Sequence, residues 1–161
     1  MSIGRSRSLG ALLAGLVALA CAAGGHEVAR GTAAPLAAGE GYLALYVDSD
    51  RPVQVIQFVR RDQGLLFEAY DFPAGGHLRI YRTQAVEHCV YIVGFAPSSQ
   101  YTAYDLHKCF AVREGALNYP GHIVFRQQGG VGETEFGVFE LRPDDAALQA
   151  ELRAGWPGLT P

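Results

Sequence analysis

The chain has 161 residues, of which 49% are apolar and 18% are charged, and its formal net charge is −3. This apolar content excludes a disordered chain, and the length suits one domain with its own hydrophobic core. A net negative charge also argues against a nucleic-acid-binding protein, which needs a basic face. The composition therefore predicts one globular domain without a nucleic-acid partner.

The first 20 residues have the pattern of a secretory signal peptide. Arg5 and Arg7 precede an uncharged apolar run over residues 9–20. A helix of that length spans about 18 Å, which is too short for the ~30 Å hydrocarbon core of a bilayer. We therefore expect residues 1–20 to be a cleaved signal rather than a membrane-spanning helix.

The apolar run ends in the sequence VALAC at residues 17–21, which resembles the lipobox of bacterial lipoproteins. The resemblance implies that Cys21 is acylated and becomes the N-terminus of the mature protein. Two other interpretations remain: cleavage at the Ala-x-Ala sequence to give a secreted protein, and a buried N-terminal helix with Cys21 in the core. Ala22 rather than Asp follows the cysteine, and by the usual enterobacterial sorting rule this favours the outer membrane.

Residues 21–40 are rich in Ala and Gly and show no strand or helix periodicity. We interpret them as the anchor site followed by a flexible tether, which would reach roughly 25 Å as a random coil. Without the signal, eleven Arg and Lys stand against sixteen Asp and Glu, so the mature part carries −5. Anionic lipid repels such a domain, and we expect the anchor to hold it at the membrane.

From residue 41 onward, short apolar runs alternate with turn residues at a spacing typical of a β-sandwich. Val, Ile, Tyr and Phe, which favour strands, dominate these runs, and Gly, Pro and Asp separate them. We therefore expect residues 41–161 to form a mainly β domain, an antiparallel β-sandwich of about eight strands. The expected strands are residues 42–47, 53–59, 65–70, 77–81, 89–95, 106–112, 122–125 and 133–141.

The C-terminal segment predicts one short helix over residues 144–156. Asp144 lies where a helix begins, and an acidic side chain is favourable at that end of the helix dipole. Leu148 and Leu152 are four residues apart and so share one face, and Pro157 ends the helix. A helix this short is marginal in isolation, so we expect its apolar face to pack on the sheet.

The spacing of two cysteines predicts a disulfide across a β-hairpin. If the hairpin is centred on Ser99, Cys89 lies directly opposite Cys109. Directly opposed strand residues are close enough for a disulfide, and this pairing leaves Cys21 as the odd cysteine. Two alternatives are a pair of free thiols and a metal site formed by Cys89, Cys109 and His107, although the spacing matches no common metal motif.

The sequence contains no recognisable catalytic motif. A glycine-rich stretch at residues 128–132 is not followed by a predicted helix, so we interpret it as a hairpin turn rather than a phosphate-binding loop. His77, His107 and His122 are the candidate catalytic histidines if the fold brings one of them to a carboxylate and a nucleophile. We expect no cofactor.

Polar and aromatic residues gather at the tip of the cysteine hairpin. Such side chains suit a contact with a glycan or another envelope protein, whereas the alternative is that the rings only pack on the sheet. The candidate contact residues are Ser98, Ser99, Gln100, Tyr101 and Tyr104. We therefore expect a non-enzymatic binding or scaffold module, with two alternatives: an inhibitor or immunity protein against a cell-wall hydrolase, and an envelope enzyme that uses a surface histidine.

Several pieces of the domain look like those of a known group of proteins. They are the turn-and-strand segments 73–77, 110–115 and 118–125 and the helix 144–156 with its Trp-Pro-Gly-Leu ending. Together they resemble small bacterial envelope lipoproteins of unknown function with an immunoglobulin- or transthyretin-like sandwich. The resemblance implies a location in the bacterial envelope, as an outer-membrane lipoprotein facing the periplasm or as a secreted or periplasmic protein. It implies no activity, because a fold does not determine function.

Overall fold

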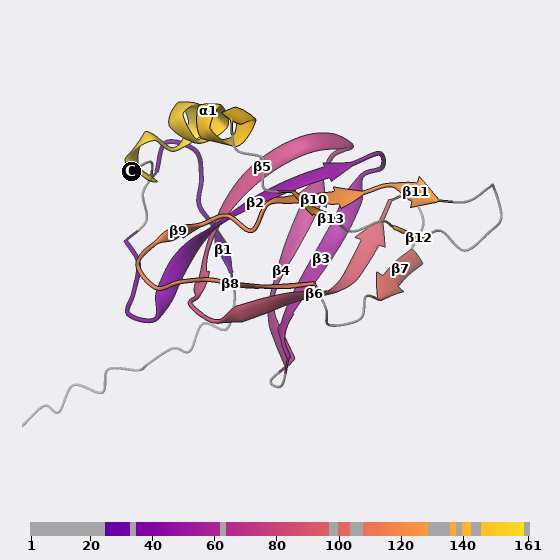
Figure 1. Cartoon of the computed structure of the whole chain (residues 1–161), viewed down its shortest axis with the longest axis horizontal. Helices are drawn as coiled ribbons and strands as arrows, with labels where there is room; N and C mark the ends of the chain where they lie inside the picture. Colours follow the sequence, from indigo (N-terminus) through magenta and orange to yellow (C-terminus); the bar gives the residue numbers. More distant parts are fainter. Residues whose placement is uncertain are drawn as a thin grey trace, which may run out of the picture.

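The structure is a computed structural model that describes residues 25–32, 35–61, 64–96, 100–103, 108–128, 136–137, 140–142 and 146–159. Two main sheets form a β-sandwich, and one short helix covers the outer face of the first sheet (Figure 1). The predicted mainly β sandwich with a single C-terminal helix is confirmed for these residues. Within the same ranges, every helix is too short or too polar to cross a membrane.

The first sheet is built around a long antiparallel pair. Its strands, in spatial order, are β1 (His26–Glu27), β5 (Gly75–Gln84), β2 (Glu40–Ser49), β10 (His122–Phe125) and β13 (Glu140–Arg142), and β9 (Leu117–Asn118) also pairs with β2. β9 and β10 both run parallel to β2, which departs from the purely antiparallel prediction. The chain reaches this sheet beside the first residues of β2, where the Gly115 amide bonds the Glu40 carbonyl at 2.9 Å, so it can only follow β2 in the same direction.

The second sheet contains the two cysteines. Its strands, in spatial order, are β4 (Gly64–Phe72), β3 (Val53–Arg60), β6 (Glu87–Phe95) and β7 (Gln100–Ala103), and β8 (Cys109–Ala111) also pairs with β6. The predicted strand 106–112 is therefore shorter, and β7 precedes it. The predicted strand 133–141 is also divided, because β12 (Phe136–Gly137) pairs with β11 (Gln127–Gln128) whereas β13 joins the first sheet.

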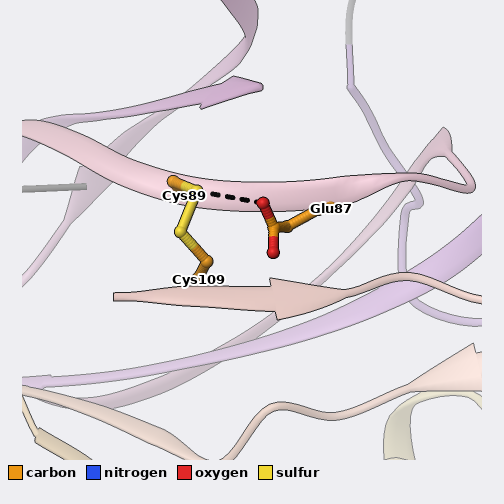
Figure 2. A group of neighbouring side chains, drawn as sticks. All are labelled: Glu87, Cys89 and Cys109. Carbon is orange, nitrogen blue, oxygen red and sulfur yellow. Dashed lines mark hydrogen bonds between the residues drawn. A yellow bond between two sulfur atoms is a disulfide. The ribbon is translucent and has the colours of Figure 1, made fainter. Parts of the chain in front are cut away.

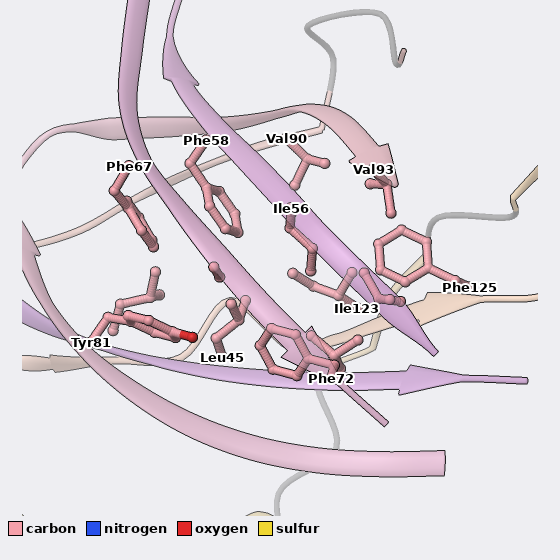
Figure 3. Close-up of a cluster of buried hydrophobic side chains, with 14 of the residues drawn as sticks. Leu45, Ile56, Phe58, Phe67, Phe72, Tyr81, Val90, Val93, Ile123 and Phe125 are labelled. Atoms are coloured by element: carbon pink, nitrogen blue, oxygen red, sulfur yellow. The ribbon is translucent and has the colours of Figure 1, made fainter. Parts of the chain in front are cut away.

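The core between the sheets takes apolar side chains from both of them (Figure 3). Along β2 the side chains alternate: Leu43, Leu45 and Val47 enter this core, whereas Ala44 and Tyr46 face the helix. The largest side chains that are completely buried in this core are Leu43, Leu45, Ile56, Phe58, Phe72, Ile123 and Phe125. Aromatic rings that each bury a large apolar area account for much of this packing.

The helix α1 (Ala146–Gly155) packs through the predicted face and is followed by the 3-10 turn η1 (Pro157–Leu159). Leu148 and Leu152 are each only 1% exposed, and they contact the outer face of the first sheet. The Trp156 indole N–H donates a hydrogen bond to the Val28 carbonyl at 3.0 Å. The predicted first residues of the helix, including Asp144, lie outside the described residues.

The region predicted as a tether is part of the domain from residue 25 onward. β1 pairs with β5, Val28 is 3% exposed, and the Gly31 amide bonds the Gly155 carbonyl at 2.8 Å. The prediction of a flexible tether over 21–40 is therefore wrong for its described part. Periodicity did not reveal this segment, because it contributes a two-residue strand and one buried apolar side chain.

Candidate functional site

Cys89 on β6 and Cys109 on β8 form a disulfide in the predicted register (Figure 2). The Cα atoms are 4.0 Å apart and the sulfur atoms 2.02 Å apart. On either side, the Val90 amide bonds the Lys108 carbonyl and the Val112 amide bonds the Val86 carbonyl. The cysteines therefore occupy a non-hydrogen-bonded position of the ladder, where opposed Cα atoms approach most closely.

Charged side chains surround the disulfide. The Glu87 carboxylate lies 3.9 Å from the Cys89 sulfur, and the Arg61 guanidinium lies 3.6 Å from Glu87 and 3.5 Å from the Cys109 sulfur. Glu87, Cys89 and Cys109 thus hold three potential metal-ligand atoms within 4.8 Å of one another. Because the disulfide consumes both thiolates, this group offers no thiolate ligand to a metal unless the disulfide is reduced. His107, the other candidate ligand, lies outside the described residues.

The two candidate catalytic histidines that the structure describes lie on opposite faces of the first sheet. His77 pairs with Val47, and its Nε2 lies 3.1 Å from the Ala74 carbonyl oxygen. His122 stacks on Tyr46 with ring centroids 4.0 Å apart, on the face that carries the helix. Its Nε2 is buried without a hydrogen-bond partner among the described residues. Among the described residues, neither histidine forms an ion pair with a carboxylate. Because the two histidines lie on opposite faces of the sheet, they do not belong to one site.

His88 is a fully buried histidine that the sequence analysis did not single out. Its Nδ1 lies 3.0 Å from the Val86 carbonyl oxygen, and its Nε2 lies 3.1 Å from the Thr83 hydroxyl. Its ring lies parallel to that of Phe110, with centroids 5.9 Å apart, and meets Phe58 edge-on. Burial lowers the pKa of His88, although the Val86 carbonyl opposes this shift. His88 is therefore a neutral structural residue at neutral pH. It pairs with Phe110 because the neighbouring residues Cys89 and Cys109 are paired in the same register.

The predicted contact loop has a different structure in its described part. Gln100 and Tyr101 belong to β7 and pair with Phe95 and Gly94 of β6, so they lie at the edge of the second sheet rather than in a loop. β7 and β8 both pair with β6, but their registers differ by three residues. A hairpin that is symmetric about a single turn would give both strands the same register, so the sequence prediction did not include this shift. The other residues of this prediction lie outside the described ranges: Ser98, Ser99 and Tyr104.

A pocket of about 450 Å³ lies between the helix and β9. Its volume is in the range of small-molecule pockets, and most of its lining is apolar. Tyr119 forms one wall and also meets the His122 ring, with centroids 6.0 Å apart. The lining residues are Ala116, Leu117, Tyr119, Leu148, Gln149, Leu152, Gly158 and Leu159.

A second hollow lies at the tip of the β3–β4 hairpin. It has a volume of about 320 Å³ and is lined by Val59, Arg60, Arg61, Gly64 and Tyr91. Tyr91 is 41% exposed at its rim. Two arginines and a tyrosine therefore contribute to the lining of this hollow.

Comparisons with protein-family models, with curated proteins and with solved structures give no match. The function is therefore inferred from the residues of this chain alone.

Proposed function

We propose that this protein is a non-enzymatic binding or scaffold module of the bacterial cell envelope. Acylated Cys21 anchors it to the outer membrane, and the β-sandwich faces the periplasm. The membrane is thus its first partner, and an envelope protein or glycan is its second.

The observation that carries this proposal is the pairing of the cysteines. The Cys89–Cys109 disulfide takes two of the three cysteines of the chain and is typical of an oxidising compartment. Cys21 is then the odd cysteine, and it directly follows the signal-like apolar run. An unpaired cysteine at this place suits covalent lipid attachment better than a role in the core.

The arrangement of the described histidines supports binding rather than catalysis. His77 contacts a turn carbonyl, His122 stacks on a tyrosine at the other face, and His88 is a buried structural residue. The edge strand β7 and the pocket beneath α1 offer surfaces for a partner or ligand. An exposed strand edge can accept a strand of another protein, which also suits an inhibitor of a cell-wall hydrolase.

Metabolic labelling with a palmitate analogue tests the anchor. We expect the wild-type chain to incorporate the label and to sediment with membranes, and Cys21→Ala to lose both properties. The double variant Cys89→Ala/Cys109→Ala is the matched control and should keep the label, because it also removes sulfur atoms but retains Cys21. Equal labelling of the wild-type and Cys21→Ala chains would contradict the proposal.

A further inference from the structure

The chain enters the sandwich at the end that carries the tip of the β3–β4 hairpin. A methyl group placed on Gly25 would lie only 2.5 Å from a ring carbon of Phe67, so the backbone of Gly25 packs directly against this ring. Phe67 follows Leu65 by two residues on β4, which corresponds to about 7 Å along a strand. Figure 1 shows this hairpin projecting from the sandwich. The first described residue is therefore close to the hairpin tip.

Covalent geometry brings this end close to the lipid, provided that Cys21 carries the proposed anchor. Four residue steps separate Cys21 from Gly25, and a fully extended chain covers about 14 Å in four steps. The roughly 25 Å tether expected from composition is therefore much shorter, because the domain begins by residue 25. The sandwich cannot stand clear of the bilayer, and the end next to Gly25 is the one nearest to it.

The exposed side chains of this end suit a membrane interface. Leu65 and Tyr91 are 53% and 41% exposed, which places them among the few large apolar residues of the described chain that face solvent. Tyrosine favours the headgroup region, because its ring is apolar and its hydroxyl is polar. The hollow beside Tyr91 is lined by Arg60 and Arg61, and guanidinium groups bind phosphate through paired hydrogen bonds.

Basic residues gather at this end of a domain that is acidic as a whole. The mature part carries −5, so most orientations bring acidic groups toward anionic lipid. At the hairpin end, the only lysine of the chain, Lys108, is exposed next to Cys109, near Arg61. Glu87 pairs with Arg61 at 3.6 Å, and Asp62 follows Arg61 in the sequence, so these two acidic residues offset part of the positive charge.

We propose that the sandwich docks on an anionic bilayer surface through the described residues where β3 ends and β4 begins, together with the neighbouring Tyr91. Leu65 and Tyr91 enter the headgroup region, and Arg60 and Arg61 contact lipid phosphates. This inference rests on the proposed lipid anchor and adds the orientation of the domain at the membrane.

Tryptophan fluorescence in reconstituted vesicles tests this orientation. The acylated full-length mature protein is placed in vesicles of phosphatidylethanolamine and phosphatidylglycerol that contain a nitroxide-labelled lipid. Leu65→Trp reports on the hairpin tip, and Tyr70→Trp is a matched control, since Tyr70 is also exposed on β4 but lies about 17 Å further along the strand. The native Trp156 is buried in both proteins and provides a common background.

We expect the lipid nitroxide to quench Leu65→Trp several-fold more than Tyr70→Trp. Adding Arg60→Gln and Arg61→Gln to Leu65→Trp should reduce this quenching, and so should replacing phosphatidylglycerol by phosphatidylcholine. Tyr91→Trp supplies a second reporter at the same end and should behave like Leu65→Trp.

The acyl group on Cys21 is measured by mass in the same preparations, which separates two kinds of failure. Acylated protein with equal quenching at positions 65, 70 and 91 would overturn the docking surface and leave the anchor intact. Mature protein without an acyl group would overturn the anchor and, with it, the docking surface.

Discussion

Among single residues, His88 shows how a titratable side chain serves as part of a core. Its two ring nitrogens face the Val86 carbonyl and the Thr83 hydroxyl, so the buried polar atoms are satisfied. The surrounding aromatic rings exclude water, and this burial lowers the pKa of His88. The imidazole is therefore neutral in the folded protein at neutral pH.

The lowered pKa of His88 makes stability dependent on pH. The unfolded chain takes up the proton below about pH 6.5, whereas the folded chain does so only at lower pH, so the free energy of unfolding should fall as the pH drops below that value. The contribution is complete above about pH 6.5 and decreases by at most about 1.4 kcal/mol per pH unit. Urea unfolding at about pH 7.5 and about pH 5.5 measures this change.

His88→Phe is the control variant for this prediction. It removes both hydrogen bonds of the ring, so it should be less stable than the wild type by about 1–3 kcal/mol at neutral pH. It has no imidazole to protonate, and the difference from the wild type should therefore narrow at the lower pH. A constant difference at both pH values would show that His88 does not titrate in this way.

At the level of elements, the short helix α1 depends on its contacts with the first sheet. Leu152→Ala should lower the free energy of unfolding by about 2–5 kcal/mol, because it opens a cavity beneath the helix. Gln149→Ala, at an exposed position of the same helix, should change it by no more than about 0.5 kcal/mol. Chemical denaturation of both variants measures the effect, and equal stabilities would contradict the packing of α1.

The disulfide joins β6 to β8 across a sequence separation of 20 residues. Removing it in Cys89→Ala/Cys109→Ala should lower the free energy of unfolding by about 3 kcal/mol, since the unfolded chain gains the freedom of an open loop. Cys21→Ala should leave the unfolding of the domain unchanged, because Cys21 precedes the packed segment. Identical denaturation midpoints for the double variant and the wild type would refute a structural role for the disulfide.

The elements that the sequence predicted correctly are those that depend on local spacing. The four-residue spacing correctly places Leu148 and Leu152 on the packed face of α1. The predicted register of Cys89 opposite Cys109 is also confirmed, although β7, which lies between these cysteines in the sequence, pairs with β6 in a different register. The parallel pairing of β10 with β2 was missed, because it depends on the end of the sandwich at which the chain changes sheets. β1 was missed because two paired residues show no periodicity.

The candidate sites also include one that the sequence predicted and others that it did not. The predicted pairing of Cys89 with Cys109 is confirmed, whereas no sequence pattern indicated the pocket beneath α1, which combines β9 with the C-terminal helix. The hollow beside Tyr91 likewise combines β3, the start of β4 and β6. Such combinations arise only when segments far apart in sequence pack together, and no local pattern records them.

For the molecule as a whole, the described domain begins only four residues after Cys21 and covers its first sheet with the C-terminal helix. The two ends of the described chain meet where Trp156 bonds the Val28 carbonyl. This closure makes the N-terminal segment part of the folded unit rather than a loose linker. A lipid on Cys21 would consequently restrict both the distance and the orientation of the sandwich at a membrane.

Under the proposed function, one chain carries both a lipid on Cys21 and a disulfide between its other two cysteines. The most direct test is the intact mass of the protein extracted from membranes of the organism that makes it, before and after reduction. We predict a chain that lacks residues 1–20, carries an acyl group on Cys21, and gains two hydrogen atoms on reduction. An unmodified Cys21, or two thiols that react with an alkylating agent before reduction, would contradict it.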